Sequence, residues 1–198
     1  MDKKFLIDDL RKQGFSEKIL NAFKNIMREN FISEKLKTSA YENIPLPIGN
    51  RQTISQPYTI AFMLSLLDLR DKQKILEVGS GSGYVLALMS KISKHSNFYG
   101  IEIIEELAEK SRNVLKDRKN VQIIHGDGSI GLLSEAPFDR IIISAAASEI
   151  PQELVNQLKI GGILVVPVKN SIIYLKKYKN KNEIKEFPGF LFVPFVRK

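Results

Sequence analysis

The spacing of apolar residues divides the chain into two regions. In the N-terminal region, four apolar residues follow the i, i+4, i+7, i+8 spacing of one helical face: Ile19, Phe23, Ile26 and Met27. Ser16 precedes this face as a candidate helix N-cap. From Lys74 onward, short apolar runs alternate with amphipathic stretches, which is the pattern of strands connected by helices. The pattern therefore predicts a helical extension followed by an α/β core.

The core is predicted to hold five strands, at residues 75–78, 97–102, 121–125, 140–144 and 163–168, with helices near 84–93, 104–116 and 151–159. Uninterrupted apolar runs such as Ile141-Ile142-Ile143 are typical of strands covered on both faces, as in a parallel sheet. Residues 172–178 and 190–196 are predicted to form an antiparallel hairpin. We expect a single domain over residues 1–198, with the extension at 1–70 and a Rossmann-like core at 71–198.

The segment before the core combines turn-forming residues with a helix. Pro45, Pro47 and Gly49 exclude a regular helix over residues 41–49 and favour an ordered surface loop. A helix from about Pro57 to Leu67 is predicted to lead into the first core strand.

Composition narrows the functional classes. No apolar run reaches the roughly 18 residues of a membrane helix, and acidic residues interrupt the N-terminal segment where a signal peptide needs an apolar core. We therefore expect a cytoplasmic protein with no membrane partner. The absence of cysteine excludes thiol catalysis and zinc–thiolate sites, and two histidines are too few for most histidine-based sites, so no metal is expected.

The net charge of +8 raises the question of an anionic partner. The densest basic stretch comprises Lys176, Lys177, Lys179, Lys181 and Lys185. Asparagines interrupt this stretch and aromatic residues are sparse, which favours a solvated hairpin tip. We expect a monomer without a stable nucleic-acid partner.

Three alternate glycines, Gly79, Gly81 and Gly83, follow the first predicted core strand, with Ser80 between the first two. Glycine lets a backbone turn sharply and approach a ligand closely. A dinucleotide fingerprint would need glycine at Tyr84, and a P-loop would need a following Gly-Lys-Ser/Thr. The loop instead suits S-adenosylmethionine, which carries no phosphate, although a purely structural turn would also select glycine.

Three acidic residues occupy the ends of predicted strands. Glu102 ends the second strand, where a doubly wound fold places an acid against ribose hydroxyls. Asp127, followed by Gly128, comes after the third strand on the same edge and can accept from an adenine amino group, although Gly-Asp-Gly is also a good turn. Glu77 precedes the glycine loop and could orient it or the cofactor's amino group.

A polar segment, Gln52-Thr53-Ile54-Ser55-Gln56-Pro57, lies directly before the helix at Pro57. Ser55 is a candidate N-cap for that helix. A serine nucleophile is disfavoured because neither a histidine base nor a Gly-x-Ser-x-Gly elbow is evident.

Several motifs follow one another along the chain: Leu46-Pro47-Ile48-Gly49, Gln52-Thr53-Ile54-Ser55-Gln56-Pro57, Leu76-Glu77-Val78-Gly79-Ser80-Gly81-Ser82-Gly83-Tyr84, Gly126-Asp127-Gly128, Ala136-Pro137-Phe138-Asp139 and Ala145-Ala146-Ala147. In this order and spacing they resemble protein-L-isoaspartate O-methyltransferases. The match spans about residues 31–168 and resumes at Phe192-Val193-Pro194.

The resemblance implies a class I S-adenosylmethionine-dependent methyltransferase fold. It also implies carboxyl methylation of L-isoaspartyl residues in damaged proteins, giving an ester that can close to a succinimide and reopen partly as aspartate. Ser55 would be the catalytic position. The residues implied to bind or border the cofactor are Gln52, Thr53, Ile54, Glu77, Gly79, Ser80, Gly81, Gly83, Glu102, Asp127 and Gly128.

Two segments depart from the family pattern and leave alternatives open. Asn50-Arg51 replaces a small, often glycine-containing pair, and Lys169-Asn170-Ser171-Ile172 lacks a glycine-rich stretch with a glutamine. One alternative is a methyltransferase acting on nucleic acid or a small molecule, although no Asp/Asn-Pro-Pro-Tyr segment follows the fourth strand. The other is a cofactor-binding protein without catalysis.

Overall fold

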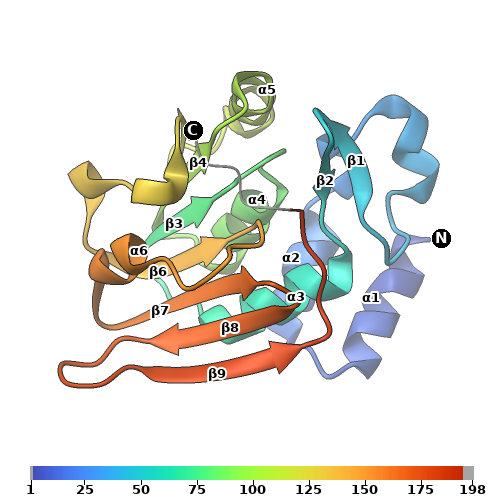
Figure 1. Ribbon diagram of the computed structural model, residues 1–198. Helices are drawn as coiled ribbons and strands as arrows, with labels where there is room; N and C mark the ends of the chain where they lie inside the picture. Colours follow the sequence, from blue (N-terminus) through green and yellow to red (C-terminus); the bar gives the residue numbers. More distant parts are fainter. Residues whose placement is uncertain (1, 194–198) are drawn as a thin grey trace.

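Seven strands form one mixed sheet in the computed structural model, which describes residues 2–193 (Figure 1). The strand order is β5-β4-β3-β6-β7-β8-β9. The first five strands of this sheet are parallel: β3 (Lys74–Val78), β4 (Asn97–Glu102), β5 (Val121–His125), β6 (Phe138–Ile143) and β7 (Leu158–Val168). The last two, β8 (Ser171–Lys176) and β9 (Glu183–Pro188), are antiparallel. The order reverses at β3, which makes the carboxyl ends of β3 and its neighbours the expected ligand edge.

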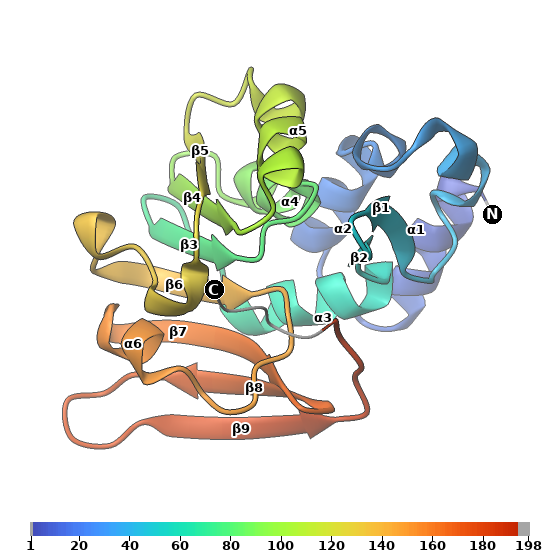
Figure 2. The ribbon, with the colours of Figure 1, turned by 45° about the horizontal axis from the view of Figure 1, so that its top comes forward.

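Helices cover both faces of this sheet (Figure 2). They are α1 (Lys3–Lys12), α2 (Glu17–Asn25), α3 (Pro57–Leu67), α4 (Tyr84–Ile92), α5 (Glu105–Leu115) and α6 (Gln152–Asn156), with short 3-10 turns at Arg28–Phe31, Glu34–Ser39, Gly128–Ile130 and Leu133–Glu135. Two hydrophobic clusters result. Ile142 packs into the cluster shared with α2, α3 and α4, while Ile141 and Ile143 pack into the cluster beside α6. The apolar run in β6 is continuous because both of its faces are buried.

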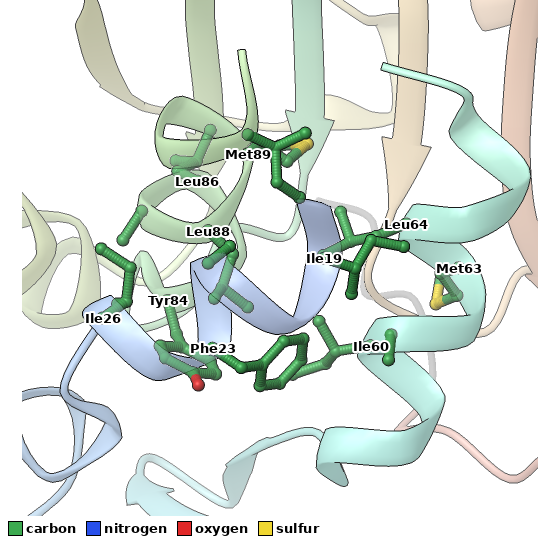
Figure 3. Close-up of a cluster of buried hydrophobic side chains, with 14 of the residues drawn as sticks. Ile19, Phe23, Ile26, Ile60, Met63, Leu64, Tyr84, Leu86, Leu88 and Met89 are labelled. Atoms are coloured by element: carbon green, nitrogen blue, oxygen red, sulfur yellow. The ribbon is translucent and has the colours of Figure 1, made fainter. Parts of the chain in front are cut away.

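The N-terminal extension packs directly on the core (Figure 3). Phe23 of α2 meets Tyr84 of α4 edge to face, with ring centroids 6.2 Å apart. Ile19 and Ile26 are buried as predicted, but Met27 is 43% exposed because α2 ends at Asn25 and the helical spacing no longer applies. Ser16 is the N-cap residue of α2, although its side chain makes no cap hydrogen bond.

The segment predicted as a surface loop is partly a strand. β1 (Leu46–Gly49) pairs antiparallel with β2 (Gln52–Ile54) in a separate two-stranded sheet. Each strand of such a pair has a free edge, so Pro47 deprives no second neighbour of a hydrogen bond. The turn residues Asn50 and Arg51 both adopt left-handed backbone conformations, with φ of 51° and 58°.

The predicted C-terminal hairpin is correct in its first strand and wrong in its second. β9 is Glu183–Pro188, not 190–196, because the lysine-rich turn is short and Lys176 pairs with Glu183. An edge strand can carry polar residues, so the sequence pattern did not indicate a strand at this position. Residues 190–193 leave the sheet, and Phe190 stacks on Phe62 of α3 at 5.1 Å. Residues 194–196 lie outside the described part of the chain.

The described residues include no helix long and apolar enough to cross a membrane. Within residues 2–193 there is also no group of three or more histidine, cysteine, aspartate or glutamate side chains that would suit a metal ion.

Candidate functional site

The glycine loop lies at the carboxyl end of β3 and is tied to the neighbouring strand. The N–H groups of Gly79 and Ser80 both donate to the carbonyl of Ile101 in β4, at 2.9 and 3.1 Å. Gly79, Gly81 and Gly83 all have positive φ, which favours glycine. These contacts hold the loop against the ends of two adjacent strands.

An inner cavity of about 150 Å³ opens beside this loop. Its lining residues are Ile48, Gln52, Thr53, Val78, Gly79, Gly81, Ile101, Glu102, Ile103, Ile104, Gly128, Ser144, Ala145 and Val193. Six of the residues predicted to bind or border a cofactor line it: Gln52, Thr53, Gly79, Gly81, Glu102 and Gly128. The β1–β2 hairpin, distant in sequence, thus forms one wall opposite the strand ends.

The remaining predicted residues lie around the inner cavity without lining it. Ile54 belongs to the hydrophobic core. Ser80 is buried, and its hydroxyl makes no hydrogen bond within residues 2–193. Gly83 is the N-cap position of α4, where a Cβ would come within 2.7 Å of Leu115 Cδ1. Gly83 is therefore required by packing between α4 and α5.

Glu102 is buried at the end of β4, and its carboxylate organises the loop. Oε2 accepts the N–H of Gly81 at 2.7 Å, and Oε1 accepts the N–H of Ile104 at 2.9 Å. Each carboxylate oxygen has two lone pairs, so both can still accept a hydrogen bond from a ligand in the cavity.

Glu77 lies one layer behind the cavity wall. Ser144, which lines the cavity, donates its hydroxyl to Glu77 Oε1 at 2.6 Å. Burial raises the pKa of Glu77 to about 8, and the charge of Glu102 adds to the rise. Glu77 Oε2 is buried without a hydrogen bond in the described part of the chain. No salt bridge with a lysine accounts for its burial among residues 2–193.

Asp127 and Gly128 follow β5 at the same edge. The Asp127 side chain accepts the N–H of Ser129 at 2.8 Å and caps the turn Gly128–Ile130. A Cβ on Gly128 would come within 2.4 Å of Val78 Cγ1. Only glycine fits at this wall without displacing β3.

Sequence reasoning missed part of the inner cavity wall: Ile48, Ile103, Ile104, Ser144, Ala145 and Val193. Ser144 and Ala145 directly follow β6, so the strand-end rule could have indicated them. Val193 follows no strand end, and its signal in the sequence was the motif Phe192-Val193-Pro194 of the family resemblance. Its carbonyl accepts the N–H of Ala146 at 2.8 Å, a contact that depends on the path of the C-terminal segment.

A larger hollow, the aromatic groove, adjoins the inner cavity and has a volume of about 1060 Å³. It is lined by Pro45, Thr53, Ser55, Gln56, Tyr58, Thr59, Phe62 and the segment from Phe187 to Val193. Thr53 and Val193 line both hollows. The two spaces therefore share a wall at the position of these two residues.

Ser55 lies in the aromatic groove and is not the N-cap of α3. The N-cap is Gln56, with Pro57 in the first turn. The Ser55 hydroxyl makes no hydrogen bond within residues 2–193, whereas its carbonyl accepts from Arg28 at 3.1 Å. The side chain is thus oriented by its backbone and remains available to a ligand.

Comparison with known proteins identifies one family. Residues 1–198 match the family described as protein-L-isoaspartate(D-aspartate) O-methyltransferase (PCMT). A protein-L-isoaspartate O-methyltransferase from Methanothrix thermoacetophila is 42% identical over 203 residues, covering 100% of this chain and 96% of that protein.

Solved structures show the same similarity. A protein-L-isoaspartate O-methyltransferase superposes with a TM-score of 0.90 at 27% identity, over 98% of this chain and 65% of that longer chain. A beta-aspartate methyltransferase (PCMT) from Plasmodium falciparum, in complex with S-adenosyl-L-homocysteine, gives a TM-score of 0.85 at 26% identity over 100% of both chains.

Proposed function

Since this chain belongs to the protein-L-isoaspartate(D-aspartate) O-methyltransferase family, we propose that the inner cavity holds its cofactor and the aromatic groove its substrate. The protein is an S-adenosylmethionine-dependent enzyme that methylates isoaspartyl residues. The observation that carries the assignment of the two hollows is their common wall at Thr53 and Val193. A shared wall is where a methyl donor and its acceptor can meet.

The inner cavity has the chemistry that a nucleoside with a cationic sulfur requires. Glu102 would accept hydrogen bonds from the ribose hydroxyls. Gly128 and Asp127 would border the adenine base. Glu77, whose Oε2 is buried without a hydrogen bond among residues 2–193, would lie behind the amino acid end. When bound, the cofactor supplies a methyl group on a positively charged sulfur, which becomes a neutral thioether as the methyl moves to oxygen.

Ser55 would act on the acceptor. The free carboxyl of an isoaspartyl residue is an α-carboxyl with an ordinary pKa of about 3.3–3.7, so it is already ionised at neutral pH and needs no general base. What it needs is alignment and exclusion of water. The Ser55 hydroxyl, which has no competing hydrogen bond within residues 2–193, would donate to the carboxylate and fix its orientation. It would not become covalently modified.

The altered segment after Val168 is compatible with this reading. Lys169 has a positive φ of 55° and forms a tight turn between β7 and β8. Asn170 contributes its carbonyl, which accepts the N–H groups of Gly189 and Phe190, both at 3.0 Å. The short turn therefore anchors the segment that forms one wall of the aromatic groove.

The test uses labelled S-adenosylmethionine and two peptides that differ only in an isoaspartyl or aspartyl residue. We expect label in the isoaspartyl peptide alone. Binding of S-adenosylhomocysteine without transfer to either peptide would favour a non-catalytic binding protein, and transfer to RNA or DNA instead would favour the nucleic-acid alternative.

We also propose that the enzyme is a single-domain, cytoplasmic monomer without a stable nucleic-acid partner. Support for one domain comes from the hydrophobic cluster that α2 and α3 share with the sheet. The basic hairpin is partly engaged internally: Lys177 donates to the carbonyls of Val155, Asn156 and Leu158. Sedimentation and a gel-shift assay at physiological salt would test these points, because a dimer or a shifted RNA or DNA band would contradict them.

A further inference from the structure

Arg28 is a completely buried charged residue for which the mechanism above has no role. It begins the 3-10 turn Arg28–Phe31 and is 0% exposed. Its guanidinium donates four hydrogen bonds, all to backbone carbonyls. Nη1 donates to Ala40 and Glu42 at 2.8 and 3.2 Å, and Nη2 donates to Ile44 and Ser55 at 2.9 and 3.1 Å.

Two of these carbonyls lie at the open end of the β1–β2 hairpin. The hairpin's last pair on this side is Leu46 with Ile54, and the carbonyls of Ile44 and Ser55 lie just beyond it. Pro45 lies between Ile44 and Leu46 and has no N–H to donate. The Arg28 guanidinium donates hydrogen bonds to both segments that extend beyond this end of the hairpin. Pro45 and Ser55 also line the aromatic groove.

The buried guanidinium both satisfies backbone carbonyls and fixes the segments that carry them. Burial lowers the pKa of Arg28 to about 10, so the group is still charged at neutral pH. Its Nε is buried without a hydrogen bond within residues 2–193, which adds to the cost of burial. An apolar side chain of similar volume would avoid that cost but would leave four backbone carbonyls without this donor. What an apolar side chain cannot provide is a rigid planar fork that fixes two chain segments relative to each other.

We propose that Arg28 is a positioning residue for methyl transfer, holding the backbone of Ser55 and of the segment before Pro45 so that the Ser55 hydroxyl meets the acceptor carboxylate. The proposal rests on the role given to Ser55 above. In this proposal Arg28 contacts neither substrate nor cofactor and acts only through the main chain of Ser55 and of the segment before Pro45. It should therefore affect the acceptor side of the reaction and leave the inner cavity unchanged.

Arg140 provides a matched control. It is 7% exposed, and its guanidinium also donates to three backbone carbonyls, those of Leu67, Asp68 and Asp139. It lies near the start of β6, where the parallel strands begin and thus away from the site, and the Asp68 carboxylate is 4.0 Å from its Nη2. Arg28→Lys and Arg140→Lys thus make the same change at two buried guanidiniums that bond backbone carbonyls, and only Arg28 is tied to Ser55.

The experiment measures kcat and KM for an isoaspartyl peptide, and Kd for S-adenosylhomocysteine, at a temperature where both variants are folded. We expect Arg28→Lys to lower kcat/KM by about tenfold or more, since misplacing a reacting group is costly, with Kd changed less than about twofold. Arg140→Lys should keep kcat/KM close to wild type. Equal kcat/KM in the two variants would overturn the proposal.

A second variant covers the case in which Arg28→Lys does not fold. Ile44→Gly loosens the backbone at one of the tethered carbonyls while keeping that carbonyl, and Ile44 is 44% exposed, outside the buried core. We expect a severalfold loss of kcat/KM at unchanged Kd, and unchanged activity would overturn the proposal. A wild-type enzyme inactive on isoaspartyl peptides would refute the function itself. An active wild type with an impaired Ser55→Ala and an unimpaired Arg28→Lys would refute only the role of Arg28.

Discussion

The inner cavity and the aromatic groove share a wall, yet they are constructed differently. Most of the inner cavity comes from the ends of neighbouring parallel strands, β3, β4, β5 and β6, where backbone N–H groups and acidic side chains converge. The aromatic groove joins the segment around Ser55 and α3 to the segment from Phe187 to Val193, which lies far away in sequence. One site follows from sheet topology, and the other depends on how two appended segments pack.

This difference predicts that substitutions in the two regions affect different properties of the enzyme. Changes at the strand ends should weaken cofactor binding, whereas changes in the groove should alter acceptor kinetics with little effect on the cofactor. A variant that affected both equally would show that the two hollows act as one site.

The largest effect is expected for Glu102→Ala. It removes the acceptor of two backbone N–H groups, at Gly81 and Ile104, as well as the proposed ribose acceptor. Each hydrogen bond to a charged group contributes about 1.5–3 kcal/mol, so affinity for S-adenosylhomocysteine should fall about 100-fold or more by calorimetry. Glu105→Ala, an exposed acid just beyond the same strand, is the control. Unchanged affinity in Glu102→Ala would remove Glu102 from the site.

Ser55→Ala tests the other side of the comparison. Losing one hydrogen bond to a carboxylate costs about 1.5–3 kcal/mol, so kcat should fall roughly ten- to hundredfold. Cofactor affinity and melting temperature should hardly change, because Gln56 and not Ser55 caps α3. Ser65→Ala, at the exposed far end of α3, is the matched control. A lower melting temperature with normal kcat would show that Ser55 is structural.

Gly128→Ala tests how tightly the wall of the inner cavity is packed, because it adds one methyl group there. The new Cβ would come within 2.4 Å of Val78 Cγ1, and overpacking of this kind costs about 1–3 kcal/mol of unfolding free energy. Gly126→Ala is a close control, because a Cβ there meets nothing within 4 Å. Denaturant unfolding should separate the two variants. Equal stability would mean that β3 yields to the added group.

Four residues that the sequence placed at strand ends line the inner cavity. Gly79, Gly81, Glu102 and Gly128 are local signals, because a glycine or an acid directly after a buried strand indicates a ligand edge. Each core strand was found, with shifts at the start of β6 and β7. Parallel strands buried on both faces are strongly apolar and hence easy to recognise.

Most of the aromatic groove could not be predicted from the sequence. The aromatic residues of 187–193 resembled a strand, whereas the true edge strand β9 is polar. The burial of Arg28 was equally unpredictable, because its four acceptors are carbonyls and carry no side-chain signature. Such features arise only when distant segments pack together.

The pH dependence of stability in Glu77→Gln tests the buried carboxyl behind the wall of the inner cavity. The pKa of Glu77 is raised from 4.5 to about 8 by burial, so the folded protein binds one more proton than the unfolded chain between those values. Stability should therefore fall as the pH rises through that window, by up to about 1.4 kcal/mol per unit. In Glu77→Gln this contribution should be absent. Unfolding curves from pH 5 to 8 with equal slopes in both proteins would contradict the assignment.

The smallest effect is expected for Arg51, at the tip of the β1–β2 hairpin. Arg51 is exposed and does not line the groove, while the side chain of its neighbour Asn50 donates to Glu106 of α5 at 3.1 Å. Any attraction for an anionic peptide would thus be indirect, raising KM only a few-fold in Arg51→Gly and fading in high salt. The same variant should gain about 1 kcal/mol of stability, because glycine relieves the left-handed backbone at φ 58°. Arg51→Ala separates the effect of charge from that of backbone strain, since it removes the charge but keeps the left-handed conformation. If both variants raise KM and only Arg51→Gly is stabilised, the charge of Arg51 assists acceptor binding. If KM at low salt is unchanged in both variants, Arg51 is a solvated turn residue.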